Sequence, residues 1–317
     1  YVLATELVES VAKACGWDMG GVKAVGTATG QQLELVKARH PFYDRESPLI
    51  LGGHVTLDAG TGCVHTAPGH SREDYEVCLQ YGIDIYSPLN DRGEYLDSVE
   101  FFAGLQVQKA NPNVIEKVKE VGNLMGQADI THSYPHCWRC KKPVIFRATT
   151  QWFVSMEANE LRQKALKAIR NDVEWIPSWG EERIYNMIEQ RPDWCISRQL
   201  WWGDRIPAWY CPDCGELIVS REEPTACPKC GSQKIVQDPD TLDTWFSSAL
   251  WPFSTLGWPD ETPELKHYYP TNTLVTGYDI IFFWVARMIF SACEYTGEKP
   301  FDTVLIHGLV RDAQGRK

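Results

Sequence analysis

The sequence has no apolar run long enough to cross a membrane. Its longest, Ile280 to Cys293, is interrupted by Arg287, whereas a spanning helix needs about 20 successive apolar residues. No secretory signal, with its basic start and short apolar stretch, opens the chain. These absences predict a cytoplasmic protein with no membrane partner.

An excess of positive charge is also missing. The 317 residues carry a net charge of −11 at pH 7. Such an acidic chain is not expected to coat nucleic acid without sequence preference, although a local basic stripe can still hold one specific RNA. A start methionine is missing as well. The chain begins at Tyr1 and stops at Lys317 without a helix cap or strand end, which predicts a piece of a longer protein.

The eleven cysteines do not indicate a disulfide scaffold. A chain of this length that is 44% hydrophobic can bury a core without covalent cross-links. Six of the cysteines form three CxxC pairs, a pattern typical of reduced thiols that bind a metal.

The chain divides into two parts by composition. The first indicates an α+β domain, with a helix at 4–15, strands at 49–51, 55–57 and 63–66, and helices at 72–81 and 113–121. After Ser133, tryptophan and arginine become frequent and a second domain begins.

The second part has the pattern of a parallel sheet. It predicts strands at 144–146, 152–155, 273–277 and 303–307, helices at 160–170, 181–189 and 279–295, and a cysteine-containing insert at 211–230. A strand, a helix and a strand in succession indicate the α/β class.

Two of the CxxC pairs have the spacing of a zinc ribbon. Cys211 and Cys214 are followed, twelve residues later, by Cys227 and Cys230. Four thiolates in this arrangement suit tetrahedral Zn²⁺, and they leave no open position for water, so we expect a structural site. Four free thiols are the alternative, but a stretch with so few apolar residues then has little to hold it.

The third pair, Cys137 and Cys140, stands alone. We interpret it as half of a second zinc site whose other ligands lie elsewhere. A redox motif and inert packing remain alternatives, although no thioredoxin-like helix follows the pair.

The segment from Gly60 to Tyr75 combines small residues with polar ones. His65, Thr66 and His70 surround a turn at Pro68-Gly69, and Asp74 is expected in the first turn of the next helix. The Asp74 carboxylate either complements the helix dipole or binds an ammonium group of a substrate.

Aromatic residues cluster in the second part. The segment from Asp193 to Gly203 holds Trp202 beside a guanidinium and a glycine, and Trp284 lies on the apolar helix. Packing in a core is the ordinary role of such tryptophans.

Together these stretches resemble the isoleucyl- and valyl-tRNA synthetases, enzymes of the Rossmann-type synthetase class. The likeness rests on Gly60 to Tyr75, Ser133 to Cys140, Phe146 to Phe153, Trp194 to Gln199, Asp243 to Phe246, and His307-Gly308 through Lys317. The last of these leads into the lysine loop of the family.

The resemblance is a mosaic. Up to about Arg198 the sequence motifs resemble those of isoleucyl enzymes, and from Leu200 on they resemble those of valyl enzymes, as in Trp201-Trp202-Gly203. A divergent synthetase, a recombinant and an artificial join are the three explanations.

The resemblance implies an α/β fold, part of a Rossmann-type parallel-sheet catalytic domain with an inserted α+β editing domain and a zinc ribbon. The implied domains are editing (1–132), return into the catalytic domain (133–205), zinc ribbon (206–236) and second catalytic half (237–317). Within the first, Asp74 is implied to hold the ammonium of a mischarged amino acid and His65 to exclude the cognate one, with Thr66 and His70 as further editing candidates.

For synthesis, the resemblance implies walls of the amino-acid pocket at Trp202 and Trp284 and an ammonium partner at Asp279. Ile280 stands where isoleucyl enzymes usually have Gln, which favours valine. His307, Gly308 and Lys317 are the implied nucleotide-binding residues, with ATP and Mg²⁺ as substrate.

The implied activity is charging of tRNA(Ile) with isoleucine by a monomer, with hydrolysis of Val-tRNA(Ile). The alternatives are a valyl enzyme that charges tRNA(Val) and edits Thr-tRNA(Val), a trans-editing deacylase, and a zinc-ribbon RNA-binding module. We expect this chain alone to be inactive in synthesis, because the His-Ile-Gly-His motif and most of the lysine loop are not in it.

Overall fold

The computed structural model describes residues 1–58, 60–127, 129 and 131–317. The chain divides into two compact units, Tyr1–Thr149 and Thr150–Lys317, each described below by itself. Within the described residues, no helix has the length and apolarity needed to span a bilayer.

The first unit is formed mostly by loops around short elements. These are η1 (Thr5–Leu7), α1 (Val8–Ala14), η2 (Met19–Gly21), α2 (Gly30–Leu33), β1 (Lys37–Arg39), β2 (Glu46–Pro48), α3 (Arg72–Gln80) and α4 (Val107–Glu120). Strands β1 and β2 pair antiparallel. The predicted helices at 4–15 and 72–81 are therefore confirmed as η1–α1 and α3.

Several predictions for this unit were wrong. No strand forms at 49–51, 55–57, 63–66 or 144–146, and β2 ends just before the first of these. Gly60 and Gly62 adopt φ of +75° and +77°, which breaks the extended course ahead of the 63–66 segment. Short runs of three or four residues with some β-branched side chains become strands only where a partner strand pairs with them.

Helix α4 begins six residues before the predicted start at Asn113 and continues through Pro112. Ala110, in the part that the prediction omitted, is fully buried. Packing at this position outweighs the hydrogen bond that Pro112 cannot donate.

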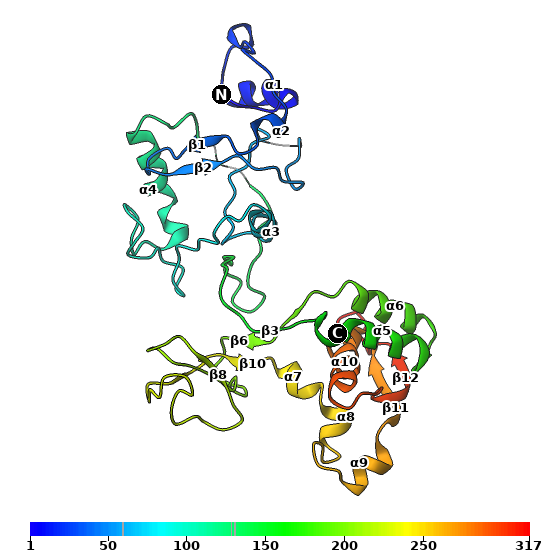
Figure 1. The fold of residues 1–317 in the computed structure, drawn as a ribbon. Helices are drawn as coiled ribbons and strands as arrows, with labels where there is room; N and C mark the ends of the chain where they lie inside the picture. Colours follow the sequence, from blue (N-terminus) through cyan, green and yellow to red (C-terminus); the bar gives the residue numbers. More distant parts are fainter. Residues whose placement is uncertain (59, 128, 130) are drawn as a thin grey trace. The chain divides into compact units, whose positions relative to one another are not determined.

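The second unit holds most of the regular structure (Figure 1). Its helices and turns are η3 (Ala158–Glu160), α5 (Leu161–Asn171), α6 (Trp179–Glu189), α7 (Thr244–Ser248), α8 (Trp251–Ser254), α9 (Pro263–Tyr268), η4 (Tyr278–Ile280), η5 (Ile281–Val285) and α10 (Ala286–Tyr295). Its strands are β3 (Phe153–Val154), β4 (Glu174–Ile176), β5 (Trp194–Cys195), β6 (Ser197–Arg198), β7 (Ala208–Tyr210), β8 (Leu217–Val219), β9 (Val236–Gln237), β10 (Thr241–Leu242), β11 (Thr271–Gly277) and β12 (Phe301–His307).

A three-stranded parallel sheet in the order β11-β12-β4 confirms the predicted α/β class. Thr273 pairs with Thr303, and Val304 pairs with Trp175. Helix α10 connects β11 to β12 and contacts α5, which in turn contacts α6 (Figure 1). The core of the unit lies between these helices and the sheet, where Phe290, Phe301 and Val304 are almost fully buried.

The predicted apolar helix at 279–295 is not one continuous α-helix. It consists of the 3₁₀ turn η4, the π-helical turn η5 and the α-helix α10. Apolar periodicity detects a buried helical segment but not the widening of one turn, because a π turn retains the same composition.

Candidate functional site

Four cysteines of the second unit meet in a small β-ribbon. All four Sγ atoms of Cys211, Cys214, Cys227 and Cys230 lie within 4.8 Å of one another. The Cys211–Cys230 and Cys214–Cys227 Sγ pairs are each 3.6 Å apart. Four thiolates around one Zn²⁺ at the usual bond length lie roughly 3.8 Å apart, so the residues fit a tetrahedral zinc ion.

The two halves of this cluster adopt the same turn. Cys211 N–H donates to Glu216 O at 2.9 Å and Gly215 N–H to Cys211 O at 2.8 Å. Cys227 and Gly231 repeat these bonds at 2.8 and 2.9 Å. Gly215 and Gly231 close the turns with φ of +72° and +75°, which favours glycine at both positions.

Amide groups in these turns point at the sulfur atoms. Burial raises the pKa of Cys227, but the N–H groups of Cys230 and Lys229 outweigh it and lower that pKa to about 7. The turn thus favours the thiolate of Cys227, the form that binds a metal, whereas burial and the neighbouring thiols raise the pKa of Cys214 to about 12 and also raise that of Cys230.

The lone CxxC of the first unit has the same backbone geometry. Cys137 N–H donates to Lys142 O and Lys141 N–H to Cys137 O, both at 2.8 Å, and Lys141 has φ of +61°. The N–H groups of Cys140 and Arg139 lower the pKa of Cys137. Among the described residues, the ribbon is the only group of three or more potential ligands, and no third one is grouped with Cys137 and Cys140.

The structure places Asp74 in the first turn of α3, as predicted. Ser71 caps this helix, and Asp74 is only 8% exposed. Its Oδ2 accepts the Ala67 N–H at 2.8 Å, and its Oδ1 lies 3.5 Å from Nε2 of His54. The carboxylate therefore fastens the turn after Thr66 to the helix.

The two predicted histidines do not bond to Asp74. His70 Nδ1 lies 2.8 Å from Phe146 O, and His65 is exposed. The neighbour of Asp74 is His54, which follows Gly52-Gly53 and carried no signal in the sequence. Gly69 is required in the turn, since a Cβ there would lie 2.3 Å from Tyr86 O.

A second candidate site lies at the carboxyl ends of β11 and β12. Asp279 forms an ion pair with Lys317, and hydrogen bonding to Lys317 is the main cause that lowers the pKa of Asp279. A Cβ on Gly277 would lie 2.8 Å from Asp279 Oδ1 and 3.6 Å from the His307 ring. Open α/β sheets bind ligands at this end of their strands.

The predicted nucleotide-binding residues begin at the end of β12. His307 Nδ1 lies 2.7 Å from Gly308 O, at the end of β12. The sheet thus brings Asp279, His307 and Lys317 to one edge.

The predicted pocket tryptophans lie in different surroundings. Trp284 Nε1 donates to Ser248 O of α7 at 3.0 Å, whereas the Trp202 side chain is 90% exposed. Trp245 stacks on Phe283, with the two ring centres 6.0 Å apart. The sequence did not predict Trp245 as a pocket wall. The motif Asp243 to Phe246 was the available signal for it.

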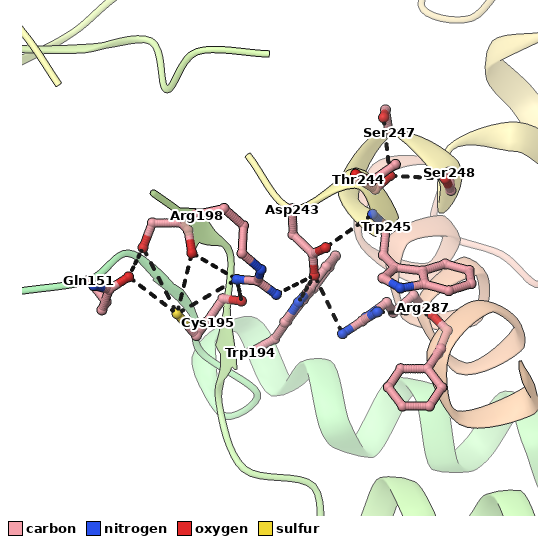
Figure 2. A network of polar contacts seen from close by, with 12 residues as sticks. Gln151, Trp194, Cys195, Arg198, Asp243, Thr244, Trp245, Ser247, Ser248 and Arg287 are labelled. Atoms are coloured by element: carbon pink, nitrogen blue, oxygen red, sulfur yellow. Dashed lines mark hydrogen bonds and ion pairs between the residues drawn. The ribbon is translucent and has the colours of Figure 1, made fainter. Parts of the chain in front are cut away.

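A polar network around the buried Asp243 includes Trp194 and Trp245 (Figure 2). Asp243 Oδ2 accepts from Trp194 Nε1 at 3.0 Å and from Arg198 Nη2 at 2.8 Å. Arg287 Nη2 lies 3.7 Å from the same oxygen, and its guanidinium lies 4.3 Å from the centre of the Trp194 ring. Asp243 also caps α7 by accepting the Trp245 N–H.

The chain is similar to known proteins over its whole length. The sequence profile of tRNA synthetases class I (I, L, M and V) matches residues 31–317. The isoleucine–tRNA ligase of Nitratidesulfovibrio vulgaris (Miyazaki F) is 51% identical over 100% of this chain and 36% of that protein. The chain therefore spans about a third of the length of such relatives.

A valine–tRNA ligase, that of Carboxydothermus hydrogenoformans, is 49% identical over 87% of this chain and 31% of that protein. A match over 87% of the chain is longer than the segment 200–317. The similarity to a valine ligase therefore extends into the part whose motifs resemble isoleucyl enzymes. A solved methionyl-tRNA synthetase of Mycobacterium tuberculosis has a TM-score of 0.38 and 16% identity over 57% of this chain and 31% of that one.

Proposed function

We propose, because this chain belongs to the class I tRNA synthetases, that it forms part of an isoleucine–tRNA ligase. The observation that carries the proposal is the 51% identity to such a ligase over 100% of the chain. The whole protein then joins isoleucine to tRNA(Ile) with ATP, as a monomer in the cytoplasm.

The sheet edge at β11 and β12 is proposed as part of the synthetic site. Asp279 binds the ammonium of the amino acid, and Trp284 and Ile280 bound its side chain, with Trp202 as a further predicted wall. His307, Gly308 and Lys317 contact ATP with its Mg²⁺, where a fixed cation stabilises charge that develops on the reacting phosphates.

The first unit is proposed to edit mischarged tRNA. A pocket that accepts isoleucine cannot strongly reject valine, because one methylene is worth only about 1–3 kcal/mol, and this amino-acid pair is the usual worked example of that limit. Hydrolysis of Val-tRNA(Ile) is therefore needed. Asp74 holds the ammonium, His65 excludes isoleucine by size, and Thr66 and His70 line the same turn.

Zinc is proposed at both kinds of cysteine site. Cys211, Cys214, Cys227 and Cys230 bind one structural Zn²⁺. Cys137 and Cys140 supply two ligands of a second site, which their shared turn geometry supports.

Valine is the second candidate substrate, and Ile280 is the observation that favours it. Gln at this position would offer hydrogen-bonding groups, whereas Ile280 offers only an apolar surface. The 49% identity to a valine ligase also supports valine as the substrate.

The whole protein should be tested for amino-acid-dependent ATP–pyrophosphate exchange. We expect a higher kcat/KM for isoleucine than for valine, and deacylation of Val-tRNA(Ile) that the Asp74→Ala variant loses. A preference for valine, with deacylation of Thr-tRNA(Val), would establish the second candidate. Exchange with neither amino acid would refute both.

A further inference from the structure

The π-helical turn η5 has an unusual hydrogen-bond pattern. The N–H of Ala286 donates to Ile281 O, five residues back. In an α-helix it would donate to Phe282 O, four residues back. The Phe282 carbonyl is thereby displaced from its standard donor, in a kind of turn that is frequent at functional sites.

Two arginines donate to successive carbonyls of this turn. Arg191 Nη1 donates to Phe282 O at 3.0 Å, and Arg287 Nη1 donates to Phe283 O at 3.2 Å. The first comes from the loop after α6 and the second from the first turn of α10. The wide turn is thus held from two elements that are far apart in the sequence.

Both guanidinium groups are buried, with Arg191 4% and Arg287 5% exposed. Desolvation lowers the pKa of each to about 10, so both keep their charge at neutral pH. Arg191 forms no ion pair with any residue that the structure describes; its charge lies 4.2 Å from the Phe282 ring centre. Burying a cation without a carboxylate is costly, which argues for a specific task.

The turn determines where the proposed amino-acid pocket lies. It begins directly after Asp279 and Ile280 and contains Trp284. Arg287 also approaches Asp243, the cap of α7, and its guanidinium lies 5.8 Å from the centre of the Trp245 ring (Figure 2). Arg287 therefore connects the turn to the helix that carries Trp245.

We propose that Arg191 and Arg287 are positioning residues that hold η5 in its π-helical form and so set the shape of the amino-acid pocket. The proposal rests on the proposed function for its effect on substrate, but not for its effect on the turn.

The test compares Arg191→Met and Arg287→Met with Arg162→Met. Arg162 Nη1 likewise donates to backbone carbonyls, Ile188 O at 2.6 Å and Glu189 O at 3.0 Å, but at the end of α6. Loss of carbonyl donors in general therefore affects all three variants, and loss of pocket geometry affects only the first two.

Pyrophosphate exchange with the whole protein gives the functional readout. Arg191→Met and Arg287→Met should raise KM for isoleucine at least tenfold and shift the isoleucine-to-valine ratio of kcat/KM at least threefold, with KM for ATP within twofold. Arg191→Lys, which retains the charge and an N–H donor group, should recover part of the loss. Arg162→Met should leave the ratio within twofold. The proposal is wrong if Arg191→Met and Arg287→Met fold and give the same KM for isoleucine and the same kcat/KM ratio as Arg162→Met.

Amide hydrogen exchange over residues 281–287 gives a readout that needs no activity. Exchange should quicken at least tenfold in Arg191→Met and remain unchanged in Arg162→Met. If the wild-type protein activates neither amino acid, the proposed function fails while this measurement still decides on the turn. Equal exchange rates in Arg191→Met and Arg162→Met would refute the positioning role. If the Met variants do not fold, the same exchange rates are measured in the Lys variants.

Discussion

At the scale of single residues, Asp243 balances charge in the interior of the second unit. The carboxylate is 6% exposed, bonds Arg198 at 2.8 Å and lies 3.7 Å from Arg287. Removing this buried carboxylate is costly, because both arginines then lose the negative charge that neutralises them.

Asp243→Asn should therefore destabilise the protein by about 3 kcal/mol, in the range for breaking a buried charge pair. The amide keeps the size of the side chain but loses the charge and one acceptor. Urea unfolding followed by tryptophan fluorescence measures the change.

Glu261→Gln is the matched control for Asp243→Asn. Glu261 pairs with Lys266 at 3.0 Å on the surface, with both side chains well exposed. Its loss should change stability by less than about 0.5 kcal/mol, as for most exposed pairs. Equal effects of the two variants would show that Asp243 is not a buried counter-ion.

Cys293 should resist alkylation in the folded protein. Burial raises the pKa of its thiol to about 11, so at pH 8 little thiolate is present. Cys15 and Cys63 are exposed. Iodoacetamide labelling with peptide mass analysis should give at least tenfold slower modification at Cys293; equal rates before unfolding would contradict its burial.

At the scale of elements, the ribbon β7, β8 and β9 depends on its cysteines. Its buried cluster contains only Trp209, Ile218, Cys211 and Cys227. So small a core cannot hold a fold by burial alone, and metal binding supplies the folding energy of such modules.

Removing zinc with a chelator should unfold residues 208–237 and leave the parallel sheet intact. Hydrogen exchange in the ribbon should rise to unprotected rates while β11 and β12 stay protected. Cys227→Ser should lower the bound zinc by one ion per chain, whereas Cys15→Ser, at an exposed thiol, should not. Unchanged protection after chelation would show that the ribbon folds without metal.

Elements with long periodic patterns were predictable from the sequence. Helices α5 and α6 and strands β11 and β12 lie within two residues of their expected bounds. Each has enough residues for a pattern to recur. The predictions of strands at 55–57 and 63–66 failed because a run of three or four residues, two of them β-branched, carries no information about a partner strand.

The candidate sites divide in the same way. Cysteine spacing predicted the ribbon because ligand chemistry demands it, and the cluster at 211–230 is confirmed as a group of four thiols. The roles of Arg191 and Arg287 had no local signal, since they depend on carbonyls that a π turn displaces. The approach of His54 Nε2 to Asp74 Oδ1, at 3.5 Å, likewise involves residues twenty positions apart.

At the scale of the whole molecule, the two units differ in their cores. The second has one continuous cluster that includes Met156, Ile184 and Phe290. In the first, the described residues form no such cluster of buried side chains, and the buried Phe102 packs against the partly exposed rings of Phe42 and Phe101. Burial of apolar surface is the dominant favourable term in folding, so the units should differ in stability.

Urea should therefore unfold residues 1–149 before residues 150–317. Hydrogen exchange with mass analysis across a urea series follows both units in one sample, and we expect separate midpoints with the lower one in the first unit. Ile289→Ala, in the core of the second unit, should move only the higher midpoint, by about 2–5 kcal/mol. A single midpoint that moves as a whole in this variant would mean that the two units unfold as one cooperative structure.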